Sequence, residues 1–267
     1  MSRPIVTRTA SFEISAANEA AVVDAILRRS GPLEPGRAHL VVTPNMNHLA
    51  ELQSSAGLGS AYAQSSMALA DGWPVVRLAR ALGVPIAERA TGSGVVALLA
   101  QTPGEGRRLF LIGGSTLAAS DEAARQFRAA GWVVAAEPAL IGWLENGDNI
   151  LGLGAAVEAF DPDIVLVGLG SPKQELLSLQ LMAVRTHAVF LGVGASIDFL
   201  AGVTHRAPLW MRRHGLEWLH RMWTDPGRLV RRYVGDLLPF LLVVRQSTRR
   251  PARVASVIPT PAPPVQR

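Results

Sequence analysis

The chain has 267 residues, of which 49% are hydrophobic and 18% are charged, a composition typical of a folded globular protein rather than a disordered one. It contains no cysteine, which excludes structural disulfides, thiolate chemistry and cysteine-ligated zinc. The net charge of +5 hides an asymmetry, because residues 206–267 carry 12 arginines against three acids, whereas residues 1–205 carry 14 basic and 18 acidic groups. A basic segment of this kind favours partners that carry phosphates, such as nucleic acid, anionic lipid or a lipid diphosphate.

Apolar runs with strand character alternate along the chain with stretches of helical period. The expected strands are Ser11–Ile14, His39–Thr43, Met67–Ala70, Leu109–Ile112, Val133–Ala136, Ile164–Val167 and Ala188–Leu191. The expected helices are Ala17–Arg29, Asn47–Leu58, Pro74–Leu82, Ser115–Ala130 with Ser115 as its cap, Ile150–Phe160 and Pro172–Val184. This alternation predicts an α/β fold with a mainly parallel sheet and helices on both faces.

The pattern changes after Gly202. Tryptophans, arginines and leucines recur at helical spacing from Pro208, and a proline-rich sequence follows Arg249. We therefore expect an α/β domain over residues 1–205, a basic amphipathic helical appendage over 206–248 and a disordered tail over 249–267. The apolar run Leu237–Val244 has eight residues, whereas a bilayer crossing needs about 20, and the N-terminal residues lack the apolar stretch of a secretory signal. A soluble or peripheral membrane protein is expected.

Ligands of a parallel α/β sheet bind beyond the carboxyl ends of the strands, so residues that follow the expected strands are the candidates for chemistry. Thr43 and Asn45 follow one strand, Asp71 follows the next, and Lys173 and Gln174 follow a glycine turn at a helix start. Glycines at the other strand ends allow backbone N–H groups to approach an anion: Gly113, Gly114, Gly168, Gly170, Gly192 and Gly194. The set predicts a site for a phosphorylated ligand.

Other nucleotide and metal motifs are matched poorly. The turn Gly192-x-Gly194-x-x-Ile197 lacks the third glycine of a dinucleotide fingerprint, and no segment matches a P-loop. Asp161-Pro162-Asp163 has the spacing of the metal clamp of many nucleotide-sugar enzymes, but it precedes a strand, and we favour a solvated turn. His48 and His187 lack a second ligand at metal spacing, so we expect packing or strand roles for them.

Seven segments, taken together and in order, carry a family resemblance. They are TPNMNHL (43–49), ADGWPVVRLARALG (70–83), ERATGS (88–93), FLIGGS (110–115), VGLGSPKQE (167–175), VGASIDFLAG (193–202) and RAPLWMRRHGLEWLHRMWTDPGRLVRRY (206–233). Over about residues 41–233 the chain resembles the WecG/TagA/CpsF family, glycosyltransferase family 26. Ser196 and Ile197 depart from the family pattern, which has an aromatic residue before Asp198.

The resemblance implies a Rossmann-like catalytic domain with a C-terminal helical appendage, and inverting sugar transfer that needs no metal or other cofactor. Donors in the family are typically UDP-sugars, including UDP-N-acetylmannosamine, its uronic acid and UDP-glucose. Acceptors are sugars on polyprenyl diphosphate, in wall teichoic acid, enterobacterial common antigen or exopolysaccharide synthesis. The expected location is the inner face of the cell membrane, with an anionic membrane surface rather than nucleic acid as partner. The sequence leaves a homo-oligomer open.

Inverting transfer needs a base for the acceptor hydroxyl and positive potential where the diphosphate leaves. Asp71 fits the base, because it ends a strand beside Gly72 and matches the family's aspartate; capping the helix near Pro74 is its structural alternative. Thr43 and Asn45 are expected to hydrogen-bond a substrate sugar, and helix capping is their alternative.

The remaining candidates are expected to bind substrate or to support the site. The resemblance implies that Gln174 contacts the sugar or a phosphate, and Lys173 either neutralises the nucleotide or is simply solvated. Asp198 is a second candidate for the base, although we favour a structural or nucleotide-contacting role. Arginines of the appendage are expected to bind the acceptor diphosphate, and the candidates are Arg206, Arg213 and Arg221, the last preferred.

Two functions of other classes stay open. One is an NAD(P)-dependent oxidoreductase with a Rossmann-like fold. The other is a non-catalytic phosphate- or nucleic-acid-binding module that uses residues 206–267, whose 12 arginines and three acids give a net charge of +9. The arginines of that segment alternate with Trp210, Trp218 and Trp223, which suits a lipid interface better than a phosphate groove.

Overall fold

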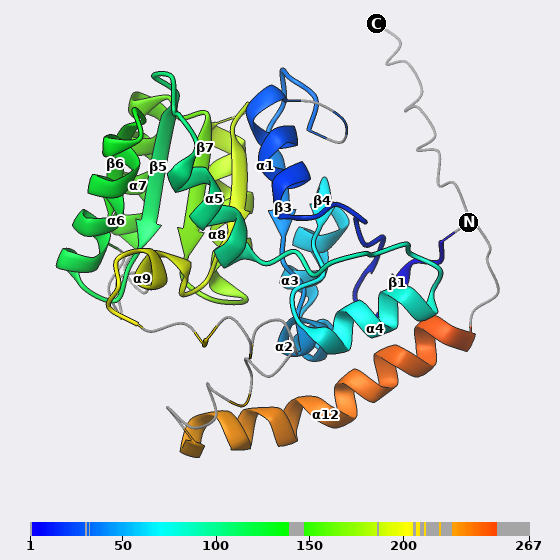
Figure 1. The fold of residues 1–267 in the computed structure, drawn as a ribbon. Helices are drawn as coiled ribbons and strands as arrows, with labels where there is room; N and C mark the ends of the chain where they lie inside the picture. Colours follow the sequence, from blue (N-terminus) through cyan, green and yellow to red (C-terminus); the bar gives the residue numbers. More distant parts are fainter. Residues whose placement is uncertain are drawn as a thin grey trace, which may run out of the picture.

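The computed structural model describes residues 2–29, 31, 33–138, 147–185, 187–204, 207–208, 211, 219 and 226–249. Its centre is a six-stranded, all-parallel sheet with the strand order β4-β3-β8-β7-β5-β6 (Figure 1). The strands are β3 (His39–Val42), β4 (Met67–Ala68), β5 (Arg108–Gly113), β6 (Val133–Glu137), β7 (Ile164–Gly168) and β8 (Val189–Gly192). The N-terminal residues add a separate antiparallel pair, β1 (Ile5–Val6) and β2 (Ser11–Phe12). The predicted α/β class and the parallel sheet are confirmed.

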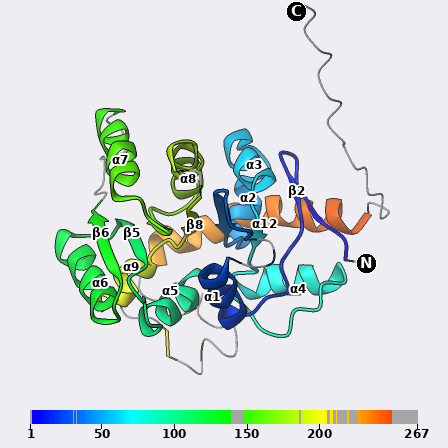
Figure 2. The same ribbon diagram turned by 90° about the horizontal axis from the view of Figure 1, so that it is seen from above.

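Helices cover both faces of the sheet. They are α1 (Glu19–Arg28), α2 (Met46–Glu51), α3 (Ala56–Ala63), α4 (Trp73–Ala81), α5 (Gly92–Gln101), α6 (Leu117–Ala129), α7 (Gly147–Phe160), α8 (Lys173–Val184), α9 (Ser196–Leu200) and α12 (Pro226–Arg249). Figure 2 shows α1, α5 and α6 on one side of the sheet and α3, α7 and α8 on the other.

The central strands are apolar throughout because both of their faces are buried. Along β3, Leu40 and Val42 pack into the cluster that contains the apolar residues of α3, α7 and α8. Val41, between them, points to the opposite cluster, which contains those of α1, α5 and α6. Successive side chains of a strand alternate between faces, so a strand with two covered faces needs an apolar residue at every position.

Several features differ from the sequence prediction, among them strand β1, which was not expected. The helix expected over Asn47–Leu58 is two helices, because Ser55 begins α3 by accepting a hydrogen bond of 3.2 Å from the Leu58 N–H on its side-chain oxygen. Helix α5 was not predicted at all. The cap of α6 is Thr116 rather than Ser115, and its Oγ1 accepts from the Ala119 N–H at 3.1 Å.

Helix α12 lies across the side of the sheet where the strands end, below α2 and α4 in Figure 1. Its C-terminal half is tied to the N-terminal residues of the chain. The buried Ser247 Oγ accepts a hydrogen bond of 2.9 Å from the Val6 N–H, and Arg3 Nη1 donates one of 3.2 Å to the Thr248 carbonyl. The predicted helical appendage therefore contains a described helix that packs on the α/β domain, while the boundary at residues 205/206 stays a prediction.

The outward face of α12 is apolar. Six exposed side chains recur at helical spacing along it and form the surface that we name the α12 stripe: Val230, Val234, Leu237, Leu238, Leu241 and Leu242. Their exposed fractions run from 38% to 72%. No helix in the described part of the chain has the length and hydropathy needed to cross a membrane.

The inward face of α12 carries Asp236, whose carboxyl group is close enough to Glu51 of α2 for the two charges to interact. Burial raises the pKa of Asp236 above its ordinary value of 3.8, Glu51 of α2 raises it further, and Arg232 lowers it. One of its oxygens, Oδ2, is buried and has no hydrogen-bond partner among the residues that the structure describes. Charge at this position therefore opposes the docking of α12.

Asp236→Asn is expected to raise the midpoint of thermal unfolding at pH 7, by about 1–2 °C. A carboxyl group whose folded-state pKa is raised destabilises the folded protein above that pKa, and the effect is lost once pH falls below the unfolded value. The gain should therefore shrink as pH is lowered toward 4. Melting curves of both proteins from pH 4 to pH 7 measure it, and a variant less stable than the parent at pH 7 would contradict it.

Candidate active site

The carboxyl ends of β3 and β8 bring Thr43 and Gln174 to the same turn. Thr43 is buried, and its Oγ1 donates a hydrogen bond of 3.3 Å to the carbonyl oxygen of Gly192, the last residue of β8. Gln174, in the first turn of α8, is 2% exposed, and its Oε1 accepts a hydrogen bond of 2.9 Å from the Gly194 N–H. Both side chains are therefore held by the backbone that leaves β8.

Asp71 reaches this edge of the sheet from β4, the neighbour of β3. Its backbone N–H donates a hydrogen bond of 3.0 Å to the carbonyl of Pro44, so it lies beside the segment that follows Thr43. The side chain is half-buried. Helix α4 begins at Trp73 with Gly72 as its N-cap, in a backbone conformation of φ 99° that favours glycine. The capping position therefore belongs to Gly72 and not to Asp71.

The neighbouring candidates are placed differently from one another. Asn45 caps α2, because its Oδ1 accepts a hydrogen bond of 3.2 Å from the His48 N–H. Its side-chain oxygen therefore has the capping role that was the alternative to sugar binding. Lys173 is exposed at the start of α8, next to the buried Gln174. The three arginine candidates of the appendage, Arg206, Arg213 and Arg221, lie outside the described residues.

The six candidate glycines fall into two groups. A Cβ on Gly113 would come within 2.8 Å of the Gly168 carbonyl oxygen, and one on Gly192 within 2.7 Å of Gln174 Nε2. Gly168 and Gly114 are similarly closed by protein atoms, at 2.8 Å and 3.1 Å. Only Gly170 and Gly194 have no described atom within 4 Å of an added Cβ, and both have positive φ. Four of these glycines therefore pack closely against protein atoms, which for Gly192 are those of the Gln174 side chain, while Gly170 and Gly194 border open space.

In the turn after β8, the Gly194 N–H is not free to bind the phosphate of a dinucleotide. That N–H is already donated to the Gln174 side chain, and Gly192 is covered by the same side chain. A pyrophosphate would have to displace Gln174 to bind the Gly194 N–H. The geometry therefore disfavours the oxidoreductase alternative.

Asp198 has a structural contact. Its Oδ1 accepts hydrogen bonds from both the N–H and the side-chain hydroxyl of Ser115, at 2.8 Å and 2.7 Å. These bonds join α9 to the segment that leaves β5. The expectation for Asp198 was a structural or nucleotide-contacting role, and these contacts describe a structural one.

The Asp161-Pro162-Asp163 turn lies at the amino end of β7, at the opposite edge of the sheet from Asp71 and Thr43. Asp161 is paired with Arg185, and Asp163 Oδ2 accepts a hydrogen bond of 2.8 Å from the Arg108 N–H. His187 lies beside Asp161 and Arg185. Within the described ranges, no three His, Cys, Asp or Glu side chains form a group that could hold a metal ion.

Sequence reasoning missed a group of buried polar side chains behind Gln174. Glu175 has no exposed surface, and its Oε1 accepts a hydrogen bond of 2.7 Å from Gln174 Nε2. His48 Nδ1 lies 3.8 Å from that oxygen and 2.8 Å from the hydroxyl of Tyr62. Burial, with smaller effects from Glu175, Glu51 and Asp71, raises the pKa of Tyr62 well above its ordinary value of 10, so its hydroxyl stays protonated.

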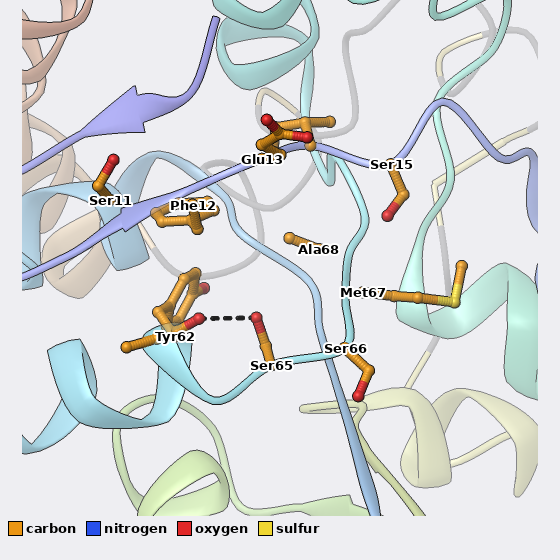
Figure 3. A pocket seen from close by; sticks show the side chains of 11 residues that line it. Ser11, Phe12, Glu13, Ser15, Tyr62, Ser65, Ser66, Met67 and Ala68 are labelled. Atoms are coloured by element: carbon orange, nitrogen blue, oxygen red, sulfur yellow. Dashed lines mark hydrogen bonds between the residues drawn. The ribbon is translucent and has the colours of Figure 1, made fainter. Parts of the chain in front are cut away.

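A depression of about 290 Å³ lies elsewhere, between β2 and the beginning of β4 (Figure 3). Ser11 and Glu13 line it from the N-terminal segment, and Ser65 and Ser66 from the residues before β4. It contains neither Thr43 nor Asp71 nor Gln174. The predicted site residues therefore gather at the carboxyl edge of the sheet, away from this depression.

A family model described as the glycosyl transferase WecG/TagA/CpsF family matches residues 7–253. The chain belongs to this family. The match extends beyond the segments that carried the sequence resemblance and includes α12, and it makes the protein a glycosyltransferase.

Gly192→Ala tests whether sugar transfer depends on the position of the Gln174 side chain. The added methyl group must push the Gln174 carboxamide away, whereas the Gly192 backbone does not need positive φ and the strand can accept alanine. We expect turnover to fall about 10- to 100-fold, as for other small displacements of positioned groups, with the fold retained.

The matched control is Gly154→Ala on α7, where no described atom lies within 4 Å of the added Cβ. It should keep normal turnover and melt at a slightly higher temperature, because alanine is the better helix former. Turnover rates and melting curves are measured for both variants. Normal turnover for Gly192→Ala would show that catalysis does not depend on the position of the Gln174 carboxamide.

Proposed function

We propose that this glycosyltransferase moves a sugar, of the N-acetylmannosamine or glucose type, from a UDP-sugar to an acceptor on polyprenyl diphosphate, with inversion and without a metal. The observation that carries the proposal is the meeting of Thr43, Asp71 and Gln174 at the carboxyl ends of β3, β4 and β8, in a chain of the WecG/TagA/CpsF family. The pathway class is the synthesis of cell-surface polysaccharide.

Asp71 is the proposed base. Direct displacement at the anomeric carbon requires that the acceptor hydroxyl lose its proton as it attacks, and a carboxylate at hydrogen-bond distance accepts it. The side chain is half-buried and Gly72 beside it has no side chain, so an acceptor hydroxyl can approach. The N-cap of α4 is Gly72, so Asp71 does not occupy the capping position of that helix.

The other residues of this edge hold the donor. The N-terminus of α8 follows the open glycine Gly170, and the positive end of a helix dipole stabilises the negative charge of a leaving diphosphate. Lys173 is exposed at that terminus and supplies a full positive charge. Thr43 and Gln174 supply hydrogen-bonding groups of fixed orientation to the sugar or phosphate. Arg206, Arg213 and Arg221 stay proposed partners of the acceptor diphosphate.

Asp71→Asn is expected to lower turnover by about 10²–10⁴, the usual contribution of a general base, while affinity for the UDP-sugar changes little. Turnover is measured with a panel of UDP-sugars and a short-chain prenyl-diphosphate acceptor, and donor binding by calorimetry. Asp121→Asn, at an exposed position on α6, is the matched control. An Asp71→Asn enzyme with the parent's turnover would exclude Asp71 as the base.

The α12 stripe is the proposed membrane contact. An apolar helix face beside exposed arginines, here Arg231, Arg245 and Arg249, is typical of a helix that lies in the plane of an anionic bilayer surface. Because α12 crosses the side of the sheet where the strands end, such contact places Asp71 and Gln174 toward the leaflet that holds a prenyl-linked acceptor (Figure 1). We propose peripheral attachment to the inner face of the cell membrane on this basis.

Leu238→Glu and Leu241→Glu should weaken binding to vesicles that contain anionic lipid by about tenfold or more each, since each removes a leucine's worth of apolar burial. The control is Leu151→Glu on α7, which changes a leucine of 75% exposure by the same chemistry at a distance from the stripe. Sedimentation with vesicles measures the binding. Equal pelleting of all three variants and the parent would show that the stripe is not the contact.

A further inference from the structure

Glu175 is a buried carboxylate with few partners. It has no exposed surface, and one of its oxygens, Oε2, has no hydrogen-bond partner within the described residues. The one described side chain near it that could carry a positive charge is His48, whose Nδ1 lies 3.8 Å from Oε1. Burying a carboxyl group with so little compensation costs free energy, and an apolar side chain of similar volume would pack there at lower cost. Packing alone therefore does not explain why an acidic residue occupies this position.

The one direct hydrogen bond of Glu175 goes to Gln174. Gln174 Nε2 donates to Glu175 Oε1 at 2.7 Å, while Gln174 Oε1 accepts from the Gly194 N–H at 2.9 Å. The two ends of a carboxamide differ, since the nitrogen only donates and the oxygen only accepts. Turning the Gln174 amide over would set its oxygen against a carboxylate and its nitrogen against an N–H group. The two contacts together therefore permit a single orientation.

On its other side Glu175 lies close to His48, with 3.8 Å between His48 Nδ1 and Glu175 Oε1. His48 of α2 lies between it and Tyr62 of α3, and the His48–Tyr62 hydrogen bond is 2.8 Å long. The loop before α8 is held as well, because Ser171 Oγ donates a hydrogen bond of 2.6 Å to Glu51 of α2. The start of α8, where Glu175 and Gln174 lie, is thus bonded to α2 through Ser171 and lies close to it at His48.

We propose that Glu175 is a positioning residue for sugar transfer. It accepts a hydrogen bond from the Gln174 amide and so keeps the second N–H of that amide directed toward the substrate at the end of β8. This inference rests on the proposed function, because it assumes that Gln174 contacts the donor. Glu175 itself touches no substrate and acts through Gln174.

The first test compares two substitutions. Glu175→Met removes the acceptor oxygens at similar length and should lower turnover about 10- to 100-fold, the usual effect of misplacing a positioned group. Glu175→Gln keeps an acceptor oxygen for Gln174 and should stay within about fivefold of the parent. In a Gln174→Ala background, Glu175→Met should lower turnover no further, because a residue that acts through Gln174 has nothing left to position.

Several outcomes overturn the proposal. Parental turnover for Glu175→Met would do so, as would the same fold-loss in the presence and absence of Gln174, since that result describes a purely structural residue. Glu158→Met, at an exposed position on α7, controls for the loss of an acid. Thermal melting of each variant identifies any loss caused by unfolding.

A second measurement needs no activity. The side-chain amide signals of Gln174, assigned by their absence from Gln174→Ala, report on its hydrogen bond in the NMR spectrum. They should move strongly in Glu175→Met and less in Glu175→Gln, where a neutral acceptor replaces a charged one. Unchanged signals in either variant would overturn the positioning role, even if Glu175→Met yielded no folded protein. If the parent transferred no sugar from any UDP-sugar, the proposed function would fail while these spectra still decided the role of Glu175.

Discussion

No side chain fits between the carboxyl ends of β5, β7 and β8. A Cβ on Gly113 would press on the backbone of Gly168, and one on Gly168 would lie 2.8 Å from the Gly194 carbonyl oxygen. The three backbones therefore pack directly against one another at the edge of the sheet. Because the turn after β8 is fixed in this way, its Gly194 N–H lies where the Gln174 side chain can bond to it. The place of Gln174 is a consequence of strand packing as much as of the helix that carries it.

The same edge combines rigidity with buried charge. Thr43, Gln174 and Glu175 are all nearly inaccessible to solvent, and each is held by a hydrogen bond to backbone or to a neighbouring side chain. Buried polar groups favour the conformations in which they are hydrogen-bonded, so these side chains keep one geometry. The incomplete pairing of Glu175 costs free energy, which the apolar packing around it must offset. Preorganised polar groups at low solvent exposure are what stabilisation of developing charge requires.

The sequence predicted the sheet, and the convergence of the candidate residues at one of its edges, because both follow from local patterns. Strands buried on both faces must be apolar throughout, and the residues after them must meet at one edge. Helix α5 escaped prediction because Gly92 and Gly94 weaken its first turn, yet a Cβ on Gly94 would collide with the carboxylate of Glu19. The need for glycine at this position comes from a tertiary contact, which a local sequence pattern does not reveal.

The roles of the glycines and of Glu175 were beyond sequence reasoning for a related cause. A glycine that leaves room for a ligand and a glycine that leaves room for another strand are identical in sequence, and only the neighbours distinguish Gly113 from Gly170. An acid in the first turn of a helix is ordinary, because it stabilises the helix dipole from solvent. Glu175 differs from that case only because α2 and α3 cover it, with His48 and Tyr62 contributed by segments more than a hundred residues away.

Helix α12 connects this rigid edge to the proposed membrane surface. Its inner face is fixed to the N-terminal residues through Ser247 and Arg3, so the exposed leucines on its outer face cannot turn inward without breaking those bonds. Six apolar side chains on one helix face are costly in water, and a lipid surface removes that cost without unfolding the helix. Since α2 both packs on α12 and supplies His48 and Glu51 to the polar groups behind Gln174, the membrane contact and the site share one structural support. Under the proposed function, docking of α12 would therefore fix which face of this edge is presented to the proposed lipid-bound acceptor.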